Sequence, residues 1–264
     1  IMTQFNSLIP LDQIEVDPKA ILAIKRNDLV PLLDNQYQLN HYADQLIQSQ
    51  SVLLNGVDPK LNQELSKVIS QLIEKLAKSN KVLKKRKFNA LQKWLGIDIE
   101  YDHGQLNYLN ELERLIDQAS FLSQRLQIEI QKSQARVQQV LGLREQMARY
   151  IVAAQEFLQE YPAFIQQRHP LDNFAERLSK KINTLQTLQA SNDIAITQMQ
   201  LAEQLSFTLL DRFKEAQQVL IPAWQYHLKQ SMQGNSVAEL QKLDHSREIL
   251  MNTLKKSLDK NRVE

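Results

Sequence analysis

Apolar residues recur every three or four positions over two long stretches of the chain, and a short segment containing Pro162 and Pro170 separates them. This spacing places the apolar side chains on one narrow stripe of an α-helix, and such a stripe is buried against another helix. The first stretch comprises Leu109, Leu112, Ile116, Ala119, Leu122, Leu126, Ile130, Val137, Val140, Met147, Ile151, Ala154 and Leu158. The second comprises Leu171, Phe174, Leu178, Ile182, Leu185, Leu188, Ala195, Met199, Ala202, Leu205, Leu209, Phe213, Ala216 and Leu220. We therefore predict an all-α fold, an elongated helical bundle built on a long antiparallel coiled-coil hairpin (about 105–160 and 171–221) with shorter flanking helices.

We expect one elongated helical domain over residues 1–264. Residues 1–26 contain two prolines and are predicted to form an irregular N-terminal segment or a short helix that packs on the body. Residues 27–96 are predicted to form the N-terminal helices. The first of these helices spans 27–50, with Pro31 in its first turn, where the missing N–H costs little. Asp58-Pro59 is a typical helix start, and the helix that follows is predicted to reach about Gly96.

The remaining boundaries follow from glycine and proline. The acidic stretch between Gly96 and Gly104 is predicted to be a turn. The long hairpin is assigned to 105–233, with a kink near Pro222, because a proline inside a helix removes a hydrogen bond and clashes with the preceding turn. Gly234 is a suitable end for that arm, and residues 235–264 are predicted to form a C-terminal helix.

Composition excludes several classes of function. With 43% hydrophobic and only 6% aromatic residues, the chain suits a thin helical core better than a compact α/β enzyme. It contains no cysteine, which excludes disulfides, iron–sulfur clusters, thiolate metal sites and thiol redox chemistry by these residues. The formal net charge of +2 gives no global argument for a nucleic-acid partner or an acidic substrate.

The location predicted from the sequence is the cytoplasm. No apolar stretch approaches the ~20 residues that span a bilayer. The first residues lack the basic and apolar regions of a secretory signal, so we expect none to be present.

A basic segment between Lys75 and Lys93 is the strongest local charge feature. It predicts a possible contact with a phosphate, an anionic membrane or a nucleic acid, with Phe88 and Trp94 as anchors. The alternative is a solvated helix face, because the positive residues spread around the helix. The candidate contact residues are Lys81, Lys84, Lys85, Arg86 and Lys87.

No pattern in the sequence predicts catalysis. The five histidines form no H-x-x-x-H or H-E-x-x-H arrangement, and no G-x-S-x-G, P-loop or Rossmann glycine pattern occurs. Acid–base catalysis needs a carboxylate pair held in a pocket, which a thin helical body rarely offers. We therefore expect no enzyme activity, no catalytic residues, no cofactor, no metal site and no small-molecule substrate.

Three segments resemble one known family. They are Gln146–Leu158, Ser191–Leu201 and Leu209–Leu228, and the last contains an Ile-Pro-x-Trp motif at Ile221, Pro222 and Trp224. They resemble the toxic anion resistance family, the TelA/KlaA-like proteins associated with tellurite resistance in bacteria, over roughly residues 65–264. Residues 235–264 are shorter than the helical tail that follows the motif in that family. Either the motif presents an aromatic contact site, or Trp224 fills the gap that a kink at Pro222 opens.

The resemblance implies a non-enzymatic, cytoplasmic helical protein connected with oxyanion or envelope stress. Our interpretation is a scaffold or interaction protein with one or more protein partners and possible self-association. The alternative is a peripheral helical rod that binds anionic membranes or nucleic acid through Lys75–Lys93. Parallel dimers and intrachain antiparallel pairs can use the same apolar stripe, so the sequence leaves the oligomeric state open.

Overall fold

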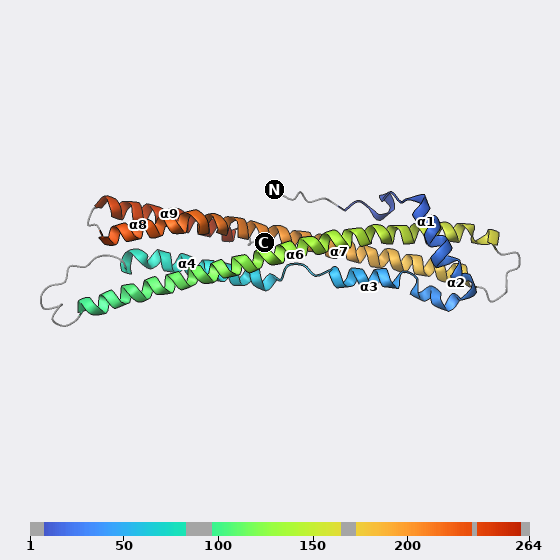
Figure 1. Cartoon of the computed structure of the whole chain (residues 1–264), viewed down its shortest axis with the longest axis horizontal. Coiled ribbons are helices and arrows are strands. Elements are labelled where there is room, and N and C mark those ends of the chain that lie inside the picture. Colours follow the sequence, from blue (N-terminus) through green and yellow to red (C-terminus); the bar gives the residue numbers. More distant parts are fainter. Residues whose placement is uncertain (1–7, 83–96, 165–172, 234–236, 260–264) are drawn as a thin grey trace. The chain divides into compact units, whose positions relative to one another are not determined.

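The computed structural model describes residues 8–82, 97–164, 173–233 and 237–259 (Figure 1). Every regular element in these ranges is helical, which confirms the predicted all-α class. The chain divides into two compact units. Unit 1 comprises Ile1–Gly56 and Lys132–Glu203, and unit 2 comprises Val57–Gln131 and Gln204–Glu264. The boundary crosses both long helices, so each unit contains part of each arm.

The two long helices are α6, Ile97–Phe164, and α7, Phe174–Glu215. In unit 1 the Tyr161 ring stacks on Phe174 with centroids 4.9 Å apart, whereas Ser133 bonds Glu203. In unit 2 Lys214 donates to Gln127 at 2.8 Å, and Gln217, just after α7, donates to Ser120 at 2.9 Å. Residues with lower sequence numbers in α6 therefore pair with residues of higher sequence number at or after α7. The arms are therefore antiparallel in both units, as the spacing of apolar residues predicted.

The ends of α6 differ from the prediction. The stretch after Gly96 was assigned to a turn, but α6 begins at Ile97 and contains Gly104, since one glycine costs a helix only ~1 kcal/mol. Pro162 was assigned to a loop, yet it lies inside the last turn of α6. The buried rings of Phe157 and Tyr161 hold that turn in the core, and this packing compensates for the hydrogen bond that Pro162 cannot donate.

The prediction of one helix over 27–50 was wrong. Residues 8–53 form six short elements, in order a 3-10 turn Leu11–Gln13, α1 Pro18–Ile24, a π turn Lys25–Leu29, α2 Pro31–Asp34, a 3-10 turn Gln36–His41 and α3 Asp44–Leu53. Asn35 adopts φ −137° and Ala43 adopts φ 63°, neither of which is right-handed helix. These two residues separate α2, the second 3-10 turn and α3.

A five-residue π turn precedes a proline at two places in the chain. In the first, Val30 N–H donates to the Lys25 carbonyl and Pro31 follows. In the second, π turn Ala216–Leu220 ends where Ile221 N–H donates to the Ala216 carbonyl, and Pro222 follows. A π turn adds one residue to the helical repeat and so accommodates the hydrogen bond and the space that proline removes. Because of the added residue, the next buried position after Ala216 is Ile221. Leu220, which the sequence predicted to be buried, is half-buried.

The core of unit 1 joins the N-terminal elements to the facing parts of α6 and α7. It contains buried residues from α1 to α3, among them Ile21, Leu29 and Tyr42, together with Met147, Phe157, Phe174 and Leu185 of the long helices. A single buried leucine or phenylalanine of this kind contributes about 1.5–3 kcal/mol. The short elements are therefore held by burial against α6 and α7 rather than by helix propensity.

Unit 2 is assembled from α4 Pro59–Val82, the beginning of α6, the end of α7, α8 Ile221–Gln233 and α9 Val237–Asp259. The predicted start of α4 is confirmed, because the Asp58 carboxylate accepts from the Lys60 N–H at 2.9 Å. The predicted end near Gly96 lies outside the described residues. α9 packs on both α8 and α4 (Figure 1).

Candidate functional site

The basic segment falls mostly outside the described residues. Lys84, Lys85, Arg86 and Lys87 lie there, and Lys81 lies in the last turn of α4.

Two basic residues at the start of this segment are described. The Lys75 ammonium pairs with Glu111 of α6, and Lys78 donates to Glu74 at 2.6 Å. Both pairs lower the pKa of their exposed carboxylates. Exposed pairs of this type contribute little to stability. The described part of the basic segment therefore has acidic neighbours and does not form a field of one sign.

An open groove of about 760 Å³ lies between α4 and α6 in unit 2. Lysine, arginine and glutamate alternate along it, including Lys67, Lys75, Glu111 and Arg114. Tyr108 is packed nearby and donates to the Lys75 carbonyl, and burial raises its pKa to about 12. The mixed charges give this groove no preference for an anion or a cation.

The Ile-Pro-x-Trp motif contributes two different faces of the helix. Ile221 is 4% exposed and Trp224 is 1% exposed, and both belong to the core of unit 2. The indole N–H of Trp224 has no acceptor among the described residues. Pro222 is exposed, and Val219 and Tyr226 on the same side are 59% and 60% exposed. The motif thus combines an inner face that packs unit 2 with an outer apolar face.

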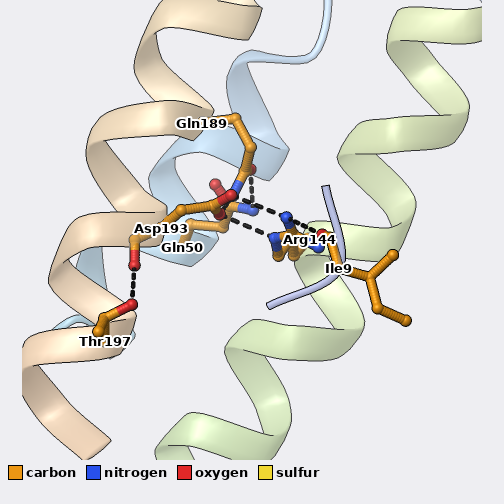
Figure 2. A network of polar contacts seen from close by, with 6 residues as sticks. All are labelled: Ile9, Gln50, Arg144, Gln189, Asp193 and Thr197. Atoms are coloured by element: carbon orange, nitrogen blue, oxygen red, sulfur yellow. Dashed lines mark hydrogen bonds and ion pairs between the residues drawn. The ribbon is translucent and has the colours of Figure 1, made fainter. Parts of the chain in front are cut away.

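A buried ion pair that the sequence reasoning missed lies in unit 1. Arg144 of α6 donates from Nε to Asp193 Oδ1 and from Nη2 to Oδ2, both at 2.8 Å (Figure 2). The same Nη2 donates to the backbone carbonyl of Ile9 at 2.7 Å. The side chain of Arg144 is 5% exposed and that of Asp193 is 23% exposed. One guanidinium therefore joins the N-terminal segment, α6 and α7.

Amide side chains extend this network to α3. Gln189 Nε2 donates to Asp193 Oδ1 at 2.7 Å, and its Oε1 accepts from Gln50 Nε2 at 2.9 Å (Figure 2). Asn192 donates to Gln50 Oε1 at 2.7 Å. Gln50 and Gln189 are both fully buried. Sliding α7 by one turn would leave these groups unpaired in the core, so the network fixes the alignment of α6, α7 and α3.

A second buried polar contact lies in the same unit. Ser133, which is fully buried, donates to Glu203 Oε1 at 2.5 Å, and burial raises the pKa of the Glu203 carboxyl. Arg136 lies near Glu203 and donates to the Gly56 carbonyl at 3.4 Å. The bond between Ser133 and Glu203 adds a polar layer between α6 and α7.

Two features are absent from the part of the chain that the structure describes. No group of three or more His, Asp or Glu side chains is arranged to hold a metal ion. No described helix is long and apolar enough to cross a membrane.

Comparison with known proteins supports the resemblance read from the sequence. No protein-family model matches the chain, and no solved structure is significantly similar to it. The chain is 27% identical to Protein KlaA of Escherichia coli over 225 residues, which covers 82% of this chain and 85% of KlaA. The chain is thus a distant relative of KlaA, and its similarity to the TelA/KlaA-like family is confirmed.

Proposed function

We propose that the protein is a non-enzymatic, cytoplasmic helical scaffold of the toxic-anion or envelope-stress resistance class. The observation that carries the proposal is the outer face of the Ile-Pro-x-Trp segment, defined here by Val219, Pro222 and Tyr226. Its inner face is committed to the core of unit 2, whereas the outer face exposes a valine and a tyrosine seven residues apart. Apolar anchors at this spacing are typical of helix recognition by a protein partner.

Two further observations support a binding role over a catalytic one. Arg144 and Asp193 in unit 1 bond each other and their neighbours, so this pair is occupied and offers no free acid or base. The distant relationship to KlaA supports the resistance class. The partner is proposed to be another protein that contacts the outer face, and self-association through the same face is the competing outcome.

Site-specific cross-linking in cells tests this proposal. A photoreactive benzoylphenylalanine at Tyr226 is expected to capture one defined partner after tellurite challenge. The same group at Leu22, which is 61% exposed in unit 1, is the matched control. Introducing Val219→Glu beside the Tyr226 probe is expected to abolish the product without unfolding the protein, because exposed substitutions rarely change stability by more than about 0.5 kcal/mol.

Three results would contradict the proposal. Equal capture from Leu22 and Tyr226 would mean that the outer face has no preferred partner. A product that survives Val219→Glu would show that this face does not carry the contact. A product made only of two copies of the chain would replace the scaffold with a homo-oligomer.

A further inference from the structure

An open cavity of about 580 Å³ in unit 1 lies between the N-terminal elements and α6. Residues from the π turn before α2, from the 3-10 turn before α3 and from α3 form one side, and Leu143, Gln146 and Tyr150 of α6 form the other. Two aspartates and one histidine line it, and no lysine or arginine does. Because Lys181 pairs with Asp44, the negative charge of the lining rests on Asp28, where it favours a positively charged ligand.

Asp28 is the carboxylate in this cavity that lacks a cationic partner. The Tyr150 hydroxyl lies close to it, and no Lys, Arg or His among the described residues pairs with it. Partial burial raises its pKa, because the charged form has lost part of its hydration. The second aspartate differs, since Asp44 binds Lys181 at 2.9 Å and His41 at 3.0 Å. A bound cation beside Asp28 would supply the positive charge that no described side chain provides.

Two aromatic rings line the same cavity as the Asp28 carboxylate. Tyr42 and Tyr150 both line the cavity, and their ring centroids are 5.4 Å apart with planes tilted by 44°. Tyr42 is fixed in place because it is 4% exposed and its hydroxyl donates to the Tyr150 carbonyl at 2.7 Å. The faces of tyrosine rings carry negative potential and attract organic cations. A carboxylate beside two aromatic rings is the kind of arrangement that recognises an ammonium group.

The backbone between Tyr42 and Asp44 is strained. Ala43 adopts φ 63° and ψ 11°, a left-handed conformation that a residue with a Cβ rarely takes. Its neighbours Tyr42 and Asp44 also line the cavity, and each is anchored, one to α6 and the other to Lys181 of α7. Such strain persists only where surrounding contacts hold it, and it concentrates at binding sites.

We propose that this cavity binds an organic ammonium ion, with its charge beside the Asp28 carboxylate and its carbon atoms against Tyr42 and Tyr150. Amide groups of Gln38, Gln45 and Gln146 line the same cavity and offer carbonyl acceptors to an ammonium that carries N–H donors. A neutral ligand of the same shape would gain neither the ion pair nor the cation–π attraction. The site therefore discriminates by charge.

Titration of the purified full chain with paired probes tests this proposal. Butylammonium and choline are compared with butanol and the neutral carbon analogue of choline, and binding is followed by calorimetry and by NMR of the tyrosine rings. At least one cation is expected to bind about tenfold more tightly than its neutral analogue. Butylammonium alone would indicate that N–H donors are required, and choline alone would indicate that the rings dominate.

Substitutions locate the site. Asp28→Asn keeps the shape of the side chain and is expected to weaken cation binding at least tenfold. Asp34→Asn, at an exposed aspartate of α2 outside the cavity, is the matched control and is expected to leave binding unchanged. Tyr150→Phe keeps the ring and should retain most of the binding. Unchanged circular dichroism shows that each variant is folded.

The proposal is overturned by either of two results. One is that each cation and its neutral analogue bind equally, or that neither cation binds at millimolar concentration. The other is that folded Asp28→Asn binds cations as tightly as Asp34→Asn does.

Discussion

Removing the carboxylate of the buried ion pair should destabilise unit 1 strongly. The Arg144 side chain is 5% exposed, and in Asp193→Ala its guanidinium keeps one acceptor, the Ile9 carbonyl. Breaking a buried pair in this way costs about 3–5 kcal/mol, and the 23% exposure of Asp193 places the expected loss near 3 kcal/mol. With a denaturant slope of about 2 kcal/mol/M, the urea midpoint of unit 1 falls by about 1.5 M.

Replacing both partners should cost less than replacing the aspartate alone. In Arg144→Met/Asp193→Leu no charge remains buried. The residual cost is the lost acceptor of Gln189, worth about 1–2 kcal/mol, because the Ile9 carbonyl can turn to water. Glu176→Ala breaks the exposed pair with Lys180 on α7 and is the matched control, with no expected change in stability.

The assay is urea unfolding followed by circular dichroism, combined with hydrogen exchange read peptide by peptide. Peptide resolution is needed because the two units need not unfold together. Arg144→Met should also accelerate exchange in residues 8–13, since the contact at Ile9 is lost. The reasoning is refuted if Asp193→Ala costs less than about 1 kcal/mol, or if the double variant is less stable than Asp193→Ala.

Three other outcomes follow from the structure. Burial raises the pKa of the Glu203 carboxyl, so the folded protein loses stability as the pH rises from the unfolded-state pKa to the folded-state pKa. Urea midpoints should therefore show Glu203→Gln to be more stable than wild type at neutral pH and equal to it in acid. Trp224→Ala should lose about 3–5 kcal/mol in the unfolding of unit 2, and a smaller loss would place the indole outside the core. If the basic segment binds anionic vesicles, reversing Lys84, Lys85 and Lys87 to glutamate should abolish salt-sensitive co-sedimentation, whereas unchanged binding would exclude the segment.

The sequence predicted the long helices because their apolar stripes are strong, but it passed over the polar residues within them. The predicted stripe of α6 jumps seven positions from Ile130 to Val137 and from Val140 to Met147. The structure places buried Ser133 and Arg144 in those gaps. A gap of seven in a stripe of threes and fours therefore marks a buried polar side chain, and this signal was present in the sequence.

The register of α7 shows why apolar residues alone mislead. The sequence placed Leu188, Ala195 and Leu205 on the buried stripe, but the structure buries Gln189, Ile196 and Ser206 instead. The displacement by one residue follows the polar network, in which Gln189 and its neighbours bond one another inside the core. Gln189 is satisfied by Gln50 of α3 as well as by its own helix, and such a buried amide cannot be recognised from one helix at a time.

The short N-terminal elements depended on contacts that lie far away in the sequence. Proline at 31 was read as the first turn of a helix, which it is, but the π turn before it and the left-handed Ala43 after it were not predicted. The cavity was likewise invisible, because Asp28 and Tyr150, which line its two sides, are more than a hundred residues apart in the sequence. For the Ile-Pro-x-Trp segment the sequence left two readings open, an aromatic contact site or a Trp224 that fills the gap at Pro222, and the structure buries Trp224.

Survival under tellurite tests most directly whether the outer face of that segment carries the function. Cells that lack the chain are complemented with wild type, with Val219→Glu/Tyr226→Glu or with Leu22→Glu, at equal protein levels, and are challenged with tellurite and with an envelope-directed agent. The account predicts that wild type and Leu22→Glu restore survival under at least one challenge and that the double variant does not. Full restoration by the folded double variant would contradict it.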